Sequence, residues 1–267
     1  MPELPGSFYY TQGMLLFIGY ARLLTFFILV PFMGGDAVPG QLRIALAFIL
    51  SLFVYPTFAA LTPPESGLPF LLWLLFTLGK ELLIGFILAY TASVIFWAML
   101  STGFLLDNQR GAGMGQTTDP SSGESTSLFG SLLNQITVYI MFSSGAFLQI
   151  VLLLLASYSI CPPGIEFSQG AEQVIPFFLM GQFSRLMTIA VVFAAPIALI
   201  CLLCDVSLGI INRFAPQLNV FFLSMPIKSA LGLLMILLYL RTLLPLVTRE
   251  LFSIDGQATA FLRAIGL

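Results

Sequence analysis

Residues that could carry out chemistry are scarce in this sequence. The 267 residues include three cysteines and no histidine. Because histidine is the commonest general base and metal ligand, its absence excludes a serine–histidine site and disfavours most enzyme chemistry. Cys201 and Cys204 have the C-x-x-C spacing, which places both thiols on one face of a helix. Since the surrounding string LICLLCD offers neither polar partners nor access, we interpret both as packing residues, and we predict no catalytic residue, metal or cofactor.

Charged residues inside apolar stretches are the second chemical feature. There are seven of them: Arg22, Lys80, Glu81, Arg185, Asp205, Lys228 and Arg241. Each costs roughly 2.5–3.5 kcal/mol at the centre of a membrane helix, so they cannot all face lipid. They are expected either to pair within the chain or reach the membrane surface, or to face water or a neighbouring subunit. The subunit interpretation places five of them at subunit contacts: Lys80, Glu81, Arg185, Asp205 and Lys228. Adjacent helical residues point about 100° apart, so Lys80 and Glu81 are each expected to meet a partner elsewhere.

The longest polar stretch, residues 101–127, has closely spaced glycines. Gly111, Gly113 and Gly115 alternate in the string RGAGMGQ, and Met114 lies among them. Glycines permit unusual backbone angles and close approach, but no Gly-Lys-Ser/Thr follows, so this is not a phosphate loop. Two interpretations stay open: a flexible aqueous loop, or a compact loop that enters a cavity, where Met114 would supply an adaptable contact.

Composition indicates the elements that must position these residues. Hydrophobic residues make up 58% of the chain and charged residues 8%, and the mean hydropathy is +1.01. A soluble protein carries about a quarter charged residues, so this chain is predicted to cross a membrane several times. Six apolar runs are predicted as helical segments: 14–33, 44–60, 70–100, 128–158, 174–211 and 218–247. Two of them contain prolines expected to break helical pairing, Pro196 and Pro226. The prediction is an all-α membrane protein, a single helical unit over 1–267 with a central loop at 101–127 and a short tail at 248–267.

Four strings in this sequence together resemble the SctT/FliR family of type III secretion export-apparatus membrane proteins. In chain order they are DAVPGQLRIALA at 36–47, KELLIGF at 80–86, DNQRGAGMGQTTDPSSG at 107–123 and GIINRFAPQLNVFFLSMPIK at 209–228. The resemblance spans about residues 14–250, and the string beginning DNQRG is similar to the injectisome branch rather than the flagellar one.

The resemblance implies both an architecture and a function. Members of this family join companion membrane subunits of the SctR and SctS type in a helical, pore-forming export gate, as a single-copy, non-catalytic subunit with helices arranged as hairpins. The implied neighbours are the switch protein SctU and the export gate SctV, and secreted effector proteins pass in transit through the bacterial inner membrane. The central loop is similar to the plug that closes the pore, and the matching positions are Gly111, Gly113, Met114, Gly115 and Asp119.

Three other functions compete with this interpretation. A flagellar-type export subunit would share the architecture. A proton-coupled transporter of small solutes would use Glu81 or Asp205, but the expected similarity between two halves is absent from the sequence. An intramembrane enzyme lacks its histidine, and only Asp205 among the aspartates lies well inside an apolar run. With a net charge of −2 and scattered basic residues, no nucleic-acid partner is predicted.

Overall fold

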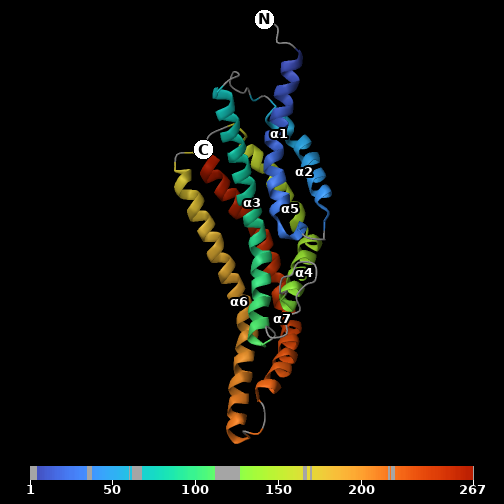
Figure 1. The fold of residues 1–267 in the computed structure, drawn as a ribbon, viewed down its shortest axis with the longest axis vertical. Helices are drawn as coiled ribbons and strands as arrows, with labels where there is room; N and C mark the ends of the chain where they lie inside the picture. Colours follow the sequence, from blue (N-terminus) through green and yellow to red (C-terminus); the bar gives the residue numbers. More distant parts are fainter. Residues whose placement is uncertain are drawn as a thin grey trace. The chain divides into compact units, whose positions relative to one another are not determined.

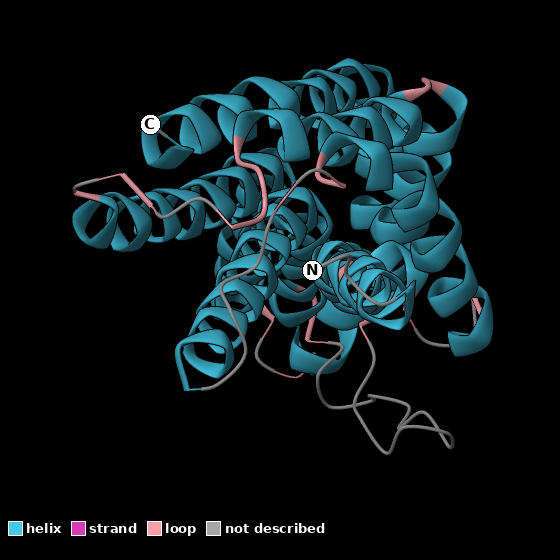
Figure 2. Cartoon of the chain, turned by 90° about the horizontal axis from the view of Figure 1, so that it is seen from above, coloured by secondary structure: helices cyan, strands magenta, loops and turns pink. Residues whose placement is uncertain are grey.

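The described residues of the chain fold almost entirely into helices (Figure 1; Figure 2). The computed structural model describes residues 5–34, 38–59, 61, 68–111, 127–164, 167, 168, 170–215, 217 and 220–266. Its α-helices are α1 (Pro5–Leu29), α2 (Gly40–Val54), α3 (Leu68–Gln109), α4 (Leu128–Ser143), α5 (Ala146–Ile160), α6 (Ala171–Phe214) and α7 (Val220–Gly266). Two short 3-10 helices, η1 (Pro31–Met33) and η2 (Tyr55–Thr57), follow α1 and α2. No strand occurs within these described ranges.

Helix ends follow local sequence signals. Pro31 lies two residues after Leu29, the last residue of α1, and a proline there cannot continue the backbone hydrogen bonds. Ser127 caps α4, and its hydroxyl accepts a hydrogen bond from the Gly130 amide. Gly111 follows α3 with a φ of 75°, the left-handed conformation that commonly ends helices at glycine. The predicted separation of the runs 174–211 and 218–247 is confirmed, because α6 ends at Phe214 and α7 begins at Val220.

Several helices differ from the predicted runs. The fourth run is two helices, α4 and α5, bent by 72° where Gly145 adopts a φ of 79°. The third helix continues to Gln109, so the first nine residues of the predicted loop are helical, and the predicted tail at 248–267 belongs to α7 as far as Gly266. Pro196 lies inside α6 and Pro226 inside α7, so each removes one backbone hydrogen bond without ending its helix. Helices α3 and α7 therefore continue into polar and charged residues, beyond the apolar runs that hydropathy defines.

The helices have the length and composition of membrane spans. Within the described residues, five are long and apolar enough to cross a membrane, or six if the bent α4–α5 pair is one span. The six predicted segments are confirmed on that count. Large apolar side chains also cover the outside of several helices, such as Phe53 at 75% exposure and Phe177 at 82%. The chain is an all-α membrane protein, since such surfaces need lipid or protein around them.

The contacts within the chain group it into two compact units, and the single helical unit over 1–267 stays a prediction. Unit 1 comprises Met1–Ser93, Gly145–Gln182 and Phe252–Leu267, and unit 2 comprises Val94–Ser144 and Phe183–Leu251. In unit 1, α1 and α2 lie side by side (Figure 1), and α1 buries residues at helical spacing: Leu15, Ile18, Arg22 and Phe26. In unit 2, the buried side chains include Phe96, Met99, Leu106, Phe129 and Met141.

Candidate functional site

The first candidate site lies in unit 2 and is formed by the C-terminal end of α3 and the N-terminal end of α4. Asp107, in the last turn of α3, accepts hydrogen bonds from residues at the start of α4. Its Oδ2 accepts from the Ser127 hydroxyl at 2.6 Å and from the Phe129 amide at 3.3 Å. Its side chain is only 7% exposed, so these bonds are largely shielded from water. One carboxylate therefore joins the two ends of the segment 112–126.

Arg110 neutralises the charge of the Asp107 carboxylate. Its Nε donates to Asp107 Oδ1 at 2.9 Å, and its Nη2 lies 2.5 Å from the same oxygen. The guanidinium also covers the Phe129 ring at 3.9 Å from the centroid. A carboxylate at the start of α4 and a cation at the end of α3 both suit the helix dipoles. We call Asp107, Arg110, Ser127 and Phe129 the Asp107 clasp.

Two glycines bring the backbones of α3 and α4 together beside the clasp. A Cβ placed on Gly103 would lie 2.1 Å from the Gly130 nitrogen, and one on Gly130 would lie 3.0 Å from the Leu100 carbonyl oxygen. Only glycine permits this approach, which is a common device where membrane helices cross. The crossing is a contact between α3 and α4 that does not include Asp107.

Lys228 of α7 contacts the same end of α3. Its Nζ donates to the Gln109 carbonyl at 3.2 Å and forms an ion pair with Asp205 of α6. A lysine is well suited to the last turn of a helix, where carbonyl groups lack amide partners. Two of the predicted buried charges, Asp205 and Lys228, thus form an ion pair within the chain, next to the C-terminal end of α3.

Most of the predicted plug lies outside the described residues. Gly113, Met114, Gly115 and Asp119 fall there. Gly111 is described: its backbone ends α3, and its position lies near the Met225 side chain, 3.4 Å from a Cβ placed there.

The second candidate site is a buried ion-pair cluster in unit 1. Arg22 of α1 donates to Glu81 of α3 through Nε at 2.8 Å and through Nη2 at 3.0 Å. It also donates to the Ser157 hydroxyl at 2.8 Å and the Cys161 carbonyl at 2.7 Å. Neither charged side chain has any exposed surface. The paired, bidentate geometry provides the compensation that buried charges require.

Aromatic rings and Lys80 enclose this pair. The Tyr158 ring lies 4.1 Å from the Arg22 guanidinium and stacks on Phe58, and its hydroxyl donates to the Gly19 carbonyl at 2.5 Å. Lys80 donates to the Pro162 carbonyl at 2.8 Å and also lies 3.8 Å from Glu81. Lys80 and Glu81 were each expected to meet separate partners. They do, but their ends also approach each other. We call Arg22, Lys80, Glu81, Tyr158 and Ser157 the Arg22 cluster.

The remaining predicted charges are more accessible. Arg185 of α6 pairs with Glu250 of α7, and their side chains are 24% and 29% exposed. Asp205 is 44% exposed on its side chain. Glu81 is fully enclosed and paired within its own chain. A subunit contact for Lys80, Glu81, Arg185, Asp205 and Lys228 stays a prediction.

Sequence reasoning assigned no site role to any of the four residues of the clasp. A serine directly before an apolar run is a helix N-cap signal, and it could have identified Ser127. No comparable signal connects it to Asp107, which is 20 positions away.

The three cysteines are free thiols and are buried. Burial raises the pKa of the Cys161 thiol, which keeps it protonated and poorly nucleophilic. Among the described residues, no group of three histidine, cysteine, aspartate or glutamate side chains is placed to hold a metal.

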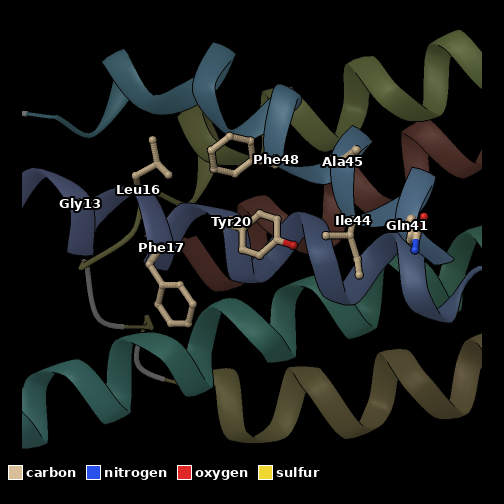
Figure 3. Close-up of a pocket in the computed structure, with 8 residues that line it drawn as sticks. All are labelled: Gly13, Leu16, Phe17, Tyr20, Gln41, Ile44, Ala45 and Phe48. Carbon is tan, nitrogen blue, oxygen red and sulfur yellow. The ribbon is translucent and has the colours of Figure 1, made fainter.

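An apolar groove of about 550 Å³ lies between α1 and α2 of unit 1 (Figure 3). Tyr20 and Phe48 meet edge-to-face in its wall, with ring centroids 6.2 Å apart. The remaining lining residues are Gly13, Leu16, Phe17, Gln41, Ile44 and Ala45. This open and almost entirely apolar wall offers no convergent polar groups that would select a polar solute.

These features define a class: a multi-span helical membrane protein with several ion pairs buried inside the chain. The chain belongs to the bacterial export proteins, family 1, whose model matches residues 14–254. It is 40% identical to the Yop proteins translocation protein T of Yersinia pestis over 219 residues, 82% of each chain. It is 31% identical to the surface presentation of antigens protein SpaR of Salmonella typhimurium, over 91% of this chain and 90% of that protein. The flagellar biosynthetic protein FliR of Bacillus subtilis is 28% identical, over 92% and 93%. The family predicted from four strings is thereby confirmed.

Proposed function

We propose that this chain is a core export-apparatus subunit of a type III protein secretion system. It helps form and close the pore through which unfolded effector proteins cross the bacterial inner membrane. Its partners are companion subunits of the SctR and SctS type, with SctU and SctV as neighbours. Family membership carries the proposal, and the higher identity to the Yop translocation protein T than to FliR favours a secretion system over a flagellum.

The long helices support a multi-subunit assembly. Helix α6 has 44 residues, which is about 66 Å at 1.5 Å per residue, against a hydrocarbon core of about 30 Å. Its exposed apolar residues extend from Phe177, at 82% exposure, to Phe214, at 84%. A bilayer alone cannot cover an apolar surface of that length, so neighbouring subunits are expected to cover the rest.

We further propose that the central segment closes the pore before secretion. The family resemblance assigns the plug to Gly111, Gly113, Met114, Gly115 and Asp119. The ends of the segment support this role because they are anchored: Gly111 ends α3, and Ser127 caps α4. An anchored segment can return to one position after a substrate has passed.

A proton-coupled transporter fits these contacts less well. Glu81 is fully buried and accepts hydrogen bonds from Nε and Nη2 of Arg22, so a proton would have to displace an ion pair. Asp205 is accessible, but it pairs with Lys228.

The test is a deletion of residues 111–115 in the complete, co-expressed apparatus. We expect the deleted complex to leak small ions across the membrane, measured as collapse of an imposed ion gradient in cells or vesicles. The same deletion in the chain expressed alone should not leak, because the pore needs its companions. Unchanged permeability of an intact, deleted complex would contradict the plug assignment.

A further inference from the structure

We propose that Asp205, on the outer face of α6, is the docking point for a helix of a companion membrane subunit, and that this helix presents a lysine or arginine to its carboxylate. The inference rests on the proposed function, because it takes the chain to work inside a multi-subunit apparatus. It adds which face of the chain is covered there and which charge the covering helix must carry.

The Asp205 carboxylate is only partly satisfied within the chain. Its Oδ1 forms an ion pair with Lys228 of α7, and no described residue donates a hydrogen bond to its Oδ2. Lys228 is shared between two acceptors, since its Nζ also donates to the Gln109 carbonyl. The Asp205 side chain is 44% exposed, whereas that of Lys228 is 11% exposed. A carboxylate accepts several hydrogen bonds, so Asp205 retains room for a donor from outside the chain.

The surroundings of Asp205 on α6 are apolar. Leu202 lies three residues before Asp205 and four before Val206, so these side chains are neighbours on the outer face of the helix. Leu202 is 56% exposed and Val206 is 55% exposed. An aspartate side chain is too short to reach a membrane surface past such neighbours, as a lysine or arginine could. Lipid would cover the two apolar side chains but leave the charge without a partner, and water would do the reverse. An apolar helix that carries one polar donor satisfies both.

The charge of Asp205 decides which donor the helix carries. The acidic residues of α6 are Glu172, in its first turn, and Asp205, and its exposed Arg213 lies in the last turn, where a cation suits the helix dipole. Asp205 therefore gives this part of the outer face a negative charge. A lysine or arginine opposite it would form a charge-assisted hydrogen bond, roughly twice as strong as one from a neutral donor. Complementary charge also fixes the register of the two helices.

The first test measures how much of this chain is retained when the complete, co-expressed apparatus is purified through a tag on a companion subunit. Asp205→Asn keeps the shape of the side chain and removes its charge. It is expected to lower retention at least about 30-fold, because it leaves the partner's cation buried and unpaired. Lys228→Gln breaks the same internal ion pair but keeps the carboxylate, so it should lower retention at most about 5-fold, the contribution of a partly exposed pair. Equal losses from the two variants would overturn the proposal, because Asp205 would then serve only the internal pair.

A second test does not depend on the folding of an Asp205 variant. A photo-reactive amino acid in place of Leu202 should cross-link this chain to a companion membrane subunit in the assembled apparatus. The cross-linked helix should carry a lysine or arginine within one turn of the attachment point. Cross-links to lipid alone, no cross-link, or a cross-linked helix without a basic residue would each overturn the proposal. If Asp205→Asn fails to accumulate in membranes, this cross-link decides the question.

A charge exchange then tests the contact from both sides. Asp205→Lys should lose retention, because it places a cation opposite the partner's cation. Replacing the basic residue of the cross-linked helix by glutamate should restore retention of the Asp205→Lys chain at least about 10-fold, because the pair is then reformed with its charges reversed. Absence of any recovery, with the parent chain retained by the same altered companion, would overturn the pairing.

The parent apparatus separates this inference from the proposed function. If the parent chain is not retained by the tagged companion, the proposed function fails and the docking point fails with it. If the parent, Asp205→Asn and Lys228→Gln are all retained, the proposed function stands and the docking point fails. If only Asp205→Asn is lost and the Leu202 position cross-links to a helix with a basic residue, both are supported.

Discussion

The Arg22 cluster and the Asp107 clasp both centre on a carboxylate that binds an arginine, but they differ in what they join. In the Arg22 cluster both charges are fully enclosed, and their partners come from three helices of unit 1. In the clasp, Asp107 and Arg110 are neighbours on one helix and keep 7% and 10% of their side-chain surface. The cluster joins helices to one another, whereas the clasp joins the ends of one segment. Buried ion pairs in this membrane protein therefore have two structural roles: one joins helices to each other, and the other joins the end of α3 to the start of α4.

The largest effect is expected when the Arg22 cluster is broken from one side. Arg22→Met leaves the Glu81 carboxylate buried without its two guanidinium hydrogen bonds, which costs about 3–5 kcal/mol. The chain should then fail to accumulate in membranes, as measured by immunoblot of the assembled apparatus. The double variant Arg22→Met with Glu81→Leu removes the orphaned charge and should recover part of the yield. An Arg22→Met chain that accumulates normally but leaks ions would contradict the view that the Arg22 cluster only joins helices.

Much of the fold could be predicted from the sequence, because hydropathy locates membrane helices with little ambiguity. The six segments and the break between α6 and α7 were found in this way. The bend at Gly145 was not, since it lies within an apolar run without proline. Helix α3 was cut short at Leu100 because the polar residues that follow resemble a loop, although they end with a glycine cap.

The partners of the charges could not be predicted, because they are remote in the chain. Glu81 meets Arg22 across 59 positions, and hydropathy contains no information about such a pair. The family string KELLIGF nevertheless acquires a physical meaning. One turn after Glu81, Gly85 lets α3 approach α1 so closely that a Cβ there would lie 2.5 Å from the Arg22 carbonyl oxygen. Likewise, the string beginning DNQRG contains Asp107, Arg110 and the glycine that ends the helix.

An intermediate effect is expected at the helix crossing beside the clasp. In Gly103→Ala the new methyl group meets the backbone of Gly130, which cannot move without shifting α4, so a cost of about 1–3 kcal/mol is expected. The control Gly209→Ala, in α6, meets nothing within 4 Å and should be neutral or stabilise by about 0.5–1 kcal/mol. Thermal unfolding of the purified apparatus measures both. Identical melting temperatures for the two variants would show that the crossing is not needed to hold α3 and α4 beside the clasp.

The smallest effect is expected at the Arg185–Glu250 pair. This pair is a reference for the Arg22 cluster and the Asp107 clasp, because it is partly exposed and contacts neither of them. Both side chains keep about a quarter of their surface, so water and ions can replace the contact, and such pairs contribute about 0–1 kcal/mol. Glu250→Gln should therefore leave apparatus yield, melting temperature and ion leak close to those of the parent. Raised salt should weaken the parent pair as well, which makes the two proteins still more alike. A loss of assembly in Glu250→Gln, with the isolated chain still folded, would instead place this pair at a subunit contact. A neighbouring subunit that excludes water from the pair would make the loss of one charge much more destabilising.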